Sequence, residues 1–209
     1  MPYIRVEMPS LKELQASLGQ TKDKSKTALK AAINATAKDL KKKMMKGARD
    51  RYKMSGNLRA EMSGANKIKS ATVRNLTAEV QVTSGVGELY DYDVKPRGYT
   101  PGGMGRGTWV SGRVMKSGGY KRLALRPGSG DQYKGFVVQY QSGHLAIAQR
   151  VPGKMMRNGA KEAIKSLSAN SITKDEEIVY REELESSVEE ELYAEIIKQV
   201  ERALPVTVV

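Results

Sequence analysis

The fold is decided above all by residues 23–52, which read DKSKTALKAAINATAKDLKKKMMKGARDRY. Apolar side chains recur along this stretch at steps of three and four residues, which is the spacing of one face of an α-helix. The apolar positions are Leu29, Ile33, Ala37, Leu40, Met44, Ala48 and Tyr52. The pattern predicts one helix about 45 Å long, enough to extend along or beyond a small domain.

Most lysines of this helix lie off its apolar stripe. The consecutive residues Lys41, Lys42 and Lys43 spread positive charge over more than half of the helix circumference. Two interpretations stay open for this surface: a basic face that contacts DNA or an acidic partner, and a solvated helix face. The lysines predicted to form an interface are Lys38, Lys41, Lys42 and Lys46.

A second long helix is predicted near the end of the chain, over about 174–204. Glutamates cover most of its surface outside one apolar seam, so the helix is amphipathic and acidic. The seam residues predicted to form an interface are Leu184, Val188, Leu192, Ile196 and Val200. Because apolar side chains gain free energy when they leave water, we expect this helix to be a docking element and not a free tail.

Alternating apolar and polar residues predict antiparallel strands around and between these helices. A short strand is expected at 3–6, and two more are expected over about 66–74 and 76–84. A hairpin is expected to join 136–140 to 144–151 through a turn that contains a glycine. The elements together predict an α+β fold, with residues 1–209 forming one domain.

Residues 98–119 hold eight glycines, a density that disfavours regular structure. We therefore expect a long mobile Gly-rich arm here, which becomes ordered when Met104, Trp109 and Met115 meet a partner. A phosphate-binding loop is the other interpretation of the glycines. It fails, because the stretch does not end in Gly-Lys-Ser/Thr and does not open a helix after a strand.

Charge is divided unevenly along the chain, whose net charge is +13. Residues 1–162 hold 31 Lys and Arg against 12 Asp and Glu, whereas residues 163–209 hold 5 against 11. A basic body with an acidic helical end suits contact with polyanions, with acidic chains or with further copies of the chain, head to tail. A solvated lysine-rich surface is the alternative.

The composition excludes several classes of site. Cysteine is absent, so disulfides, thiolate metal sites and cysteine nucleophiles are excluded. The sequence begins with no apolar leader, and no stretch reaches the roughly 20 apolar residues that span a bilayer. A soluble protein without membrane contact is expected.

Catalytic residues are not predicted. His144 is the single histidine, and the sequence indicates no partner group that would make it a general base. Asp91 and Asp93 share one face of a strand, but no third ligand follows at a spacing typical of metal sites. Aromatic residues interleaved with basic residues on a sheet, a pattern typical of nucleic-acid-binding modules, are not apparent either. We predict no enzymatic activity, no cofactor-binding residue and no metal ligand.

Three short motifs carry a resemblance to a known family. They are Ala-Ile-Asn-Ala-Thr-Ala at 32–37, Lys-Ser-Ala-Thr-Val at 69–73 and Ile-Ala-Gln-Arg-Val-Pro-Gly at 147–153. With the closing helix they resemble the minor tail protein Z group of lambda-like phages, within the tail-completion proteins. The chain departs from the lambda-type pattern in its strongly acidic last helix and in lacking a concentrated arginine cluster in its loop region.

The resemblance implies a non-enzymatic α+β protein that forms a homo-oligomeric ring, hexameric in the family, at the head-proximal end of a phage tail. Its implied partners are the tail terminator, the tail tube and neck or portal-proximal proteins, and contact with DNA in the lumen stays open. The implied location is the virion tail or neck, assembled in the cytoplasm of the bacterial host. The alternative hypothesis is a basic nucleic-acid-binding protein that contacts phosphates through the 23–52 helix.

Overall fold

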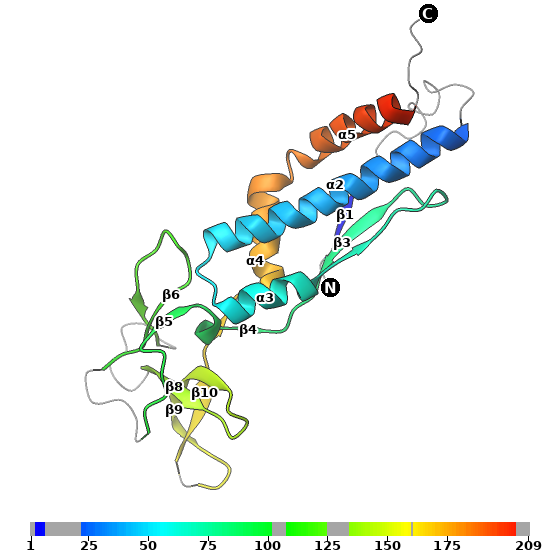
Figure 1. Cartoon of the computed structure of the whole chain (residues 1–209). Coiled ribbons are helices and arrows are strands. Elements are labelled where there is room, and N and C mark those ends of the chain that lie inside the picture. The colour runs from blue at the N-terminus through cyan, green and yellow to red at the C-terminus, as the bar shows by residue number, and fades with distance from the viewer. Residues whose placement is uncertain (1–2, 7–21, 102–107, 125–133, 160, 204–209) are drawn as a thin grey trace, which may run out of the picture. The chain divides into compact units, whose positions relative to one another are not determined.

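The structure, a computed structural model, describes residues 3–6, 22–101, 108–124, 134–159 and 161–203. It is an α+β fold with a long N-terminal helix, antiparallel sheets and a C-terminal helix, as the sequence predicts (Figure 1). The chain forms two compact units. Unit 1 comprises Met1–Gly47, Ser63–Thr83 and Glu176–Val209, and unit 2 comprises Ala48–Met62 and Ser84–Asp175. The single domain predicted from the sequence stays a prediction.

Unit 1 is organised by α2, which confirms the predicted N-terminal helix. Every apolar position of the predicted stripe is buried, with exposed fractions of 5% or less. A three-stranded antiparallel sheet has the order β1-β3-β2, and Ile4 of β1 and Ile68 of β2 both pair with Val80 of β3. The elements are β1 (Tyr3–Val6), α2 (Lys22–Arg51), α3 (Gly56–Ala65), β2 (Asn66–Lys69) and β3 (Ala78–Val82). The last turn of α2 and most of α3 belong to unit 2.

Polar contacts connect α2 to β2 and to the chain that follows it. The Asn34 side chain donates to the carbonyl oxygen of Ala71 (3.1 Å) and accepts from the Ala71 amide (2.7 Å). The Lys41 Nζ donates to the carbonyl oxygen of Asn66 (2.8 Å). These bonds fix α2 relative to the sheet of unit 1 and leave fewer backbone groups without a partner.

The C-terminal helix is interrupted where the sequence predicts one continuous helix. Three pieces replace it: α4 (Ile172–Val179), a π-helical turn (Tyr180–Leu184) and α5 (Val188–Ala203). After the π turn, the amide and the hydroxyl of Ser187 both approach the carbonyl oxygen of Leu184 (3.0 Å each), which in a continuous α-helix would accept from the amide of residue 188. Serine bonding to the backbone in this way favours a break, and α5 begins at the next residue.

Unit 2 is built from short antiparallel strands. Its sheets have the orders β5-β6-β7, β10-β9-β8 and β11-β4. A core cluster of Val94, Val110, Val137, Ile147 and Leu167 joins residues that lie far apart in the sequence. The strands are β4 (Gly87–Glu88), β5 (Asp93–Lys95), β6 (Ser111–Arg113), β7 (Lys121–Arg122), β8 (Gly135–Gln139), β9 (Leu145–Met155), β10 (Glu162–Ser166) and β11 (Ser168–Ala169), with a 3-10 turn at Leu89–Asp91.

The predicted hairpin is confirmed as β8 and β9, with Val137 opposite Ile147 and a turn that places Gly143 at φ +81°. A positive φ is the conformation that glycine adopts without steric cost. The strands predicted over 66–74 and 76–84 are present as the shorter β2 and β3. Between them the chain turns at residues 72–75, where the Thr72 amide donates to the carbonyl oxygen of Asn75 (2.8 Å).

The predicted Gly-rich arm differs from the structure over residues 108–119. Here the chain forms β6, and Val110 is fully buried in the core of unit 2. Gly112 is buried in this strand, and a Cβ there would lie 3.1 Å from the Leu123 side chain, so this glycine allows a close approach. Met104 lies outside the described residues.

Candidate functional site

The two compact units divide the net charge differently from the two halves of the linear sequence. The segments of unit 2 hold 19 Lys and Arg against 8 Asp and Glu, a net charge of +11. The segments of unit 1 hold 17 against 15, a net of +2, because they combine the basic α2 with the acidic α5. Nearly all of the excess positive charge therefore belongs to unit 2.

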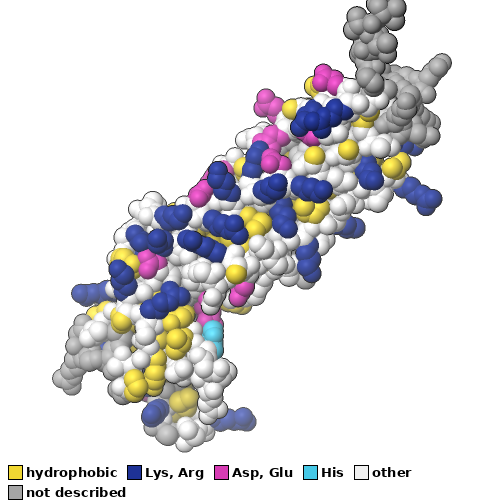
Figure 2. Space-filling model, in the orientation of Figure 1, with side chains coloured by type: hydrophobic (Ala, Val, Ile, Leu, Met, Phe, Trp, Pro, Cys, Tyr) yellow, Lys and Arg dark blue, Asp and Glu magenta, His cyan; other side chains and the backbone are white. Residues whose placement is uncertain are grey.

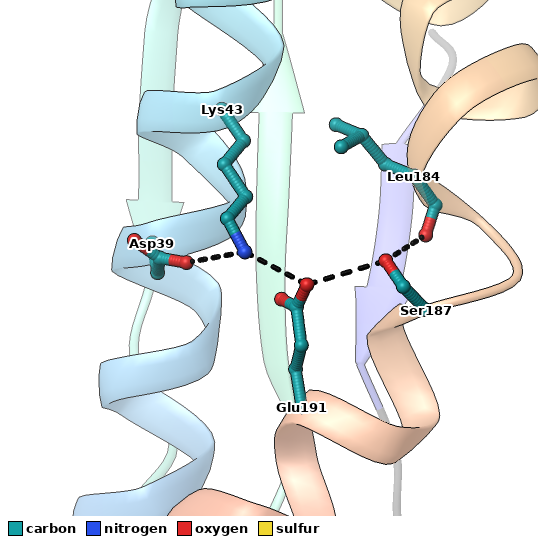
Figure 3. A network of polar contacts seen from close by, with 5 residues as sticks. All are labelled: Asp39, Lys43, Leu184, Ser187 and Glu191. Carbon is teal, nitrogen blue, oxygen red and sulfur yellow. Dashed lines mark hydrogen bonds and ion pairs between the residues drawn. The ribbon is translucent and has the colours of Figure 1, made fainter.

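Within unit 1 the acidic helix pairs with the basic helix of the same chain. α5 runs alongside α2 (Figure 1), and the Lys43 Nζ lies 2.7 Å from a carboxylate oxygen of Glu191 and 3.0 Å from one of Asp39. Figure 3 shows that Glu191 also accepts a hydrogen bond from Ser187 at the start of α5 (3.2 Å). The hydrogen bond to Glu191, followed by the one to Asp39, raises the pKa of Lys43 above its ordinary value.

The four lysines predicted to form an interface divide into two kinds. Lys38, Lys42 and Lys46 are exposed on α2, whereas Lys41 is half-buried and bonds to the backbone at Asn66. Figure 2 shows Lys and Arg side chains spread along the face that α2 occupies, with Asp and Glu gathered beside them along α5. Three of the four lysines are thus available at the surface, and the fourth has a structural contact.

The predicted seam of the C-terminal helix is largely covered in the chain by itself. Leu192 and Ile196 are buried, with exposed fractions of 3% and 2%. Leu184, Val188 and Val200 are half-buried. Of the residues predicted for the Gly-rich arm, Trp109 is half-buried and Met115 is 40% exposed.

Unit 2 contains a basic hollow of about 470 Å³ on the sheet β5-β6-β7. Strand register builds it: Asp93 of β5 stands opposite Arg113 of β6, and Lys95 shares the face of Asp93 because side chains alternate along a strand. Tyr120 immediately precedes β7, which pairs with β6. The hollow is lined by Lys53, Met54, Ser55, Arg59, Tyr92, Asp93, Lys95, Arg97, Arg113 and Tyr120.

Asp93 anchors two neighbours in this hollow. One of its oxygens accepts hydrogen bonds from Tyr120 Oη and Arg113 Nη2, both at 2.8 Å. These bonds, the one from Tyr120 first, lower the pKa of Asp93 below its ordinary value. Two cations lie over the Tyr120 ring, with Lys95 Nζ 4.6 Å and Arg113 Cζ 5.1 Å from its centroid.

Arg97 is held in a similar way by Tyr90. Its guanidinium lies 4.9 Å from the Tyr90 ring centroid, and it donates to the carbonyl oxygens of Tyr92 (3.1 Å) and Tyr90 (3.3 Å). The Tyr90 hydroxyl donates back to the carbonyl oxygen of Arg97 (2.8 Å). The β5-β6-β7 sheet and the chain beside it therefore carry basic residues interleaved with aromatic residues. Spacing along the sequence does not reveal this pattern, because strand pairing brings Tyr120 to Lys95 and Arg113.

Beneath the hollow, the buried Tyr92 is tied to the start of α4. Its hydroxyl lies 2.7 Å from Asp175 Oδ2 and 3.0 Å from the carbonyl oxygen of Asn170. Burial raises the pKa of Tyr92 and the pKa of Asp175 above their ordinary values. Both groups hold their protons more strongly than in water, and Tyr92 acts as a neutral hydrogen-bond donor.

His144 has a partner that the sequence did not indicate. Its Nε2 lies 3.0 Å from a carboxylate oxygen of Glu88, and its ring stacks on Tyr140. The His144 side chain is 53% exposed, so the pair lies at the surface of unit 2. Within the described residues, no three His, Cys, Asp or Glu side chains gather closely enough to hold a metal ion. Asp91 and Asp93, the carboxylates considered for a metal, belong to that part of the chain.

Comparison with known proteins adds no further assignment. Neither a protein-family model nor a curated protein nor a solved structure matches this chain. None of the helices in the described segments combines the length and the apolar character that crossing a bilayer requires.

Proposed function

We propose that the chain is a structural subunit of a bacteriophage virion, a tail-completion or neck component without enzymatic activity. In this proposal it forms a homo-oligomeric ring at the head-proximal end of the tail and contributes to head–tail joining. The support is the resemblance of its three short motifs to the minor tail protein Z group, together with an α+β fold of the kind that the resemblance implies.

The observation that carries the proposal is a second apolar surface on α5. The inner residues Leu192 and Ile196 are buried, yet Tyr193 and Ile197 are 37% and 60% exposed. These two outer residues are four positions apart, so they are neighbours on the helix surface. Large apolar side chains that stay adjacent and exposed on a helix already packed on its other side favour contact with another chain.

A second copy is the occupant that we assign to this surface. The acidic residues of α5 are partly neutralised within the chain by Lys43, so a copy that approaches the outer residues meets less repulsion than an unpaired acidic helix would offer. A contact between different surfaces of successive copies closes into a ring when the rotation between copies allows it.

Light scattering coupled to size-exclusion chromatography tests the assembly. We expect the wild-type chain to form a multimer, and we expect the double variant Tyr193→Ser, Ile197→Ser to shift towards the monomer. The matched control is Val86→Ser, which removes an 81% exposed apolar side chain from unit 2 and should leave the mass unchanged. A wild-type chain that stays monomeric at every concentration, or a double variant that assembles normally, would refute the proposal.

Complementation of a phage that lacks this gene product tests the virion role. Wild-type protein should restore infectivity, and the Tyr193→Ser, Ile197→Ser variant should leave heads and tails unjoined in electron micrographs. His144→Ala should restore infectivity fully, because a structural subunit does not need a general base. A folded His144→Ala protein that fails to complement would instead indicate an active site.

A further inference from the structure

The basic hollow of unit 2 has the character of an anion site. Five cationic side chains line it, and among the described lining residues Asp93 is the one carboxylate. Asp93 is already bonded to Arg113 and Tyr120, so it orients these two groups and neutralises one charge. The remaining cations face the same solvent-filled space, where like charges raise one another's energy until an anion binds.

The lining offers little to an apolar ligand. Met54 and Tyr92 are themselves buried, with exposed fractions of 5% and 0%, so that Tyr120 is the one partly exposed apolar side chain of the described lining. The core of a protein–protein contact needs apolar surface to bury, whereas nucleic-acid interfaces are polar and strongly positive. The hollow therefore suits a hydrated polyanion better than the acidic face of an amphipathic helix.

Three of the five cations are held in place before any ligand arrives. Lys95 and Arg113 lie over the ring of Tyr120, and Arg97 stacks on Tyr90 while bonding to two carbonyl groups. Side chains fixed in this way lose little conformational entropy on binding. Tyr120 is 37% exposed and presents part of its ring beside these charges, as in sites where aromatic and basic residues alternate along a nucleic-acid strand.

Further positive groups extend the surface beyond the hollow. The α3 helix begins at Gly56, next to the lining residue Ser55, and the start of a helix presents amide groups and a partial positive charge to anions. On β7, Arg122 is exposed and pairs with Ser111, so it shares the face of Lys95 and Arg113. The positive surface is thus longer than a single phosphate group requires.

We propose that the hollow and this flanking segment bind the phosphodiester backbone of a nucleic acid, without reading its sequence. The site lies on the sheet of unit 2 and not on the basic face of α2. In unit 1 the acidic residues of α5 nearly balance the charge, and the α2 lysines Lys41 and Lys43 already have partners in the chain. The proposal does not depend on ring formation, since the hollow is built entirely from residues of unit 2.

Fluorescence anisotropy with a short labelled DNA duplex tests the site. The full chain is titrated at salt concentrations between about 50 and 200 mM, where the slope of log K against log salt reports the number of phosphates contacted. The hollow variant is Arg59→Gln, Lys95→Gln, two changes that spare the side chains bonded to Asp93 and to the Tyr90 and Tyr92 carbonyls. We expect this variant to reduce the magnitude of the slope by about 2 and the affinity at low salt by roughly tenfold or more.

The matched control is Lys38→Gln, Lys42→Gln, which removes the same charge from exposed positions of α2. It should bind the duplex nearly as well as the wild type does, and both variants should melt at the wild-type temperature. An equal loss of DNA affinity in both variants would overturn the proposal, because binding would then follow net charge alone. An unchanged affinity in the hollow variant would overturn it as well. Displacement of the duplex by a peptide of residues 182–201 more readily than by unlabelled duplex would also overturn it in favour of an acidic protein partner. If the hollow variant melts at a lower temperature and the control variant does not, Lys95→Gln is replaced by Lys95→Arg, which keeps the charge and the stacking. For the proposal to stand, DNA binding must then be stronger than in the original hollow variant.

Discussion

Gly87 is the position where one added methyl group should do the most damage. It lies in β4, buried, and pairs with Ala169 of β11. A Cβ at this position would overlap the carbonyl oxygen of Asn170 and lie 2.5 Å from its carbonyl carbon and 3.0 Å from the Ser171 amide nitrogen. These atoms belong to the backbone, so they cannot turn aside as a flexible side chain would.

The magnitude of the Gly87→Ala effect follows from what must move. Overpacking costs about 1–3 kcal/mol. A shift of Asn170 also weakens the bond that its carbonyl accepts from Tyr92, which contributes about 1 kcal/mol. We therefore expect the free energy of unfolding to fall by about 2–4 kcal/mol. For a chain of this size the melting temperature should fall by roughly 5–15 °C.

Circular dichroism melting and urea unfolding measure the effect of Gly87→Ala. The matched control is Gly85→Ala, two residues earlier, where an added Cβ meets nothing within 4 Å. The control should melt within about 2 °C of the wild type, since surface substitutions change stability by at most about 0.5 kcal/mol. Equal midpoints for the two variants would refute the reasoning, because they would show that the β4–β11 contact yields without cost.

Three further predictions concern α5, its contact with α2 and the basic hollow. Leu192→Ala should lower the free energy of unfolding by about 2–4 kcal/mol in urea denaturation, because Leu192 is buried, whereas Val86→Ala, at an exposed position outside the proposed self-association surface, should change it by at most about 0.5 kcal/mol. In urea denaturation, Lys43→Ala should lower the free energy of unfolding by roughly 0.5–1 kcal/mol more than Lys42→Ala does. The difference is small because the Lys43–Glu191 pair is half-exposed, and high salt should reduce it further. Asp93→Asn should lower the free energy of unfolding at neutral pH, and its difference from the wild type should shrink as the pH falls below about 4. The reason is that the lowered pKa of Asp93 stabilises the wild type above the unfolded-state pKa, and this stabilisation is lost as the pH falls through the folded-state pKa. A deficit that stays constant from pH 6 to about pH 2 would contradict this assignment.

Helix α2 and the β8–β9 hairpin were predictable because their signals are local. A helix buries one face, and the periodicity of that face is written in consecutive residues such as Leu29, Ile33 and Leu40, all of which are buried. A hairpin needs two alternating runs and a turn, and the run of residues 136–151 contains all three. The helix needs only some apolar surface to pack against, and each strand of the hairpin pairs with the other. Neither element therefore depends on a strand register that is set by distant residues.

The basic hollow was not predictable from spacing, because strand pairing creates it. Lys95, Arg113 and Tyr120 are separated in the sequence, and each looks like an ordinary surface residue. Register places Asp93 opposite Arg113, and this pairing then positions the other two groups. The predicted Gly-rich arm extended wrongly over β6 for a related reason: glycine density indicates flexibility in an isolated segment, but Gly112 serves close packing once Leu123 lies against it.

The two proposals use separate residues, and this makes them independent in experiment. The self-association surface is Tyr193 and Ile197 of α5 in unit 1, and the nucleic-acid site is the hollow around Arg59 and Lys95 in unit 2. Because the two sets of residues share no partner, their energetic effects should add, and the α5 variant should retain the salt-dependent DNA affinity of a single subunit. The hollow variant should likewise retain its multimeric mass. If removing the α5 side chains also abolished DNA binding, the polyanion would have to contact a surface that exists only between copies, and the hollow of a single chain would not be a sufficient site.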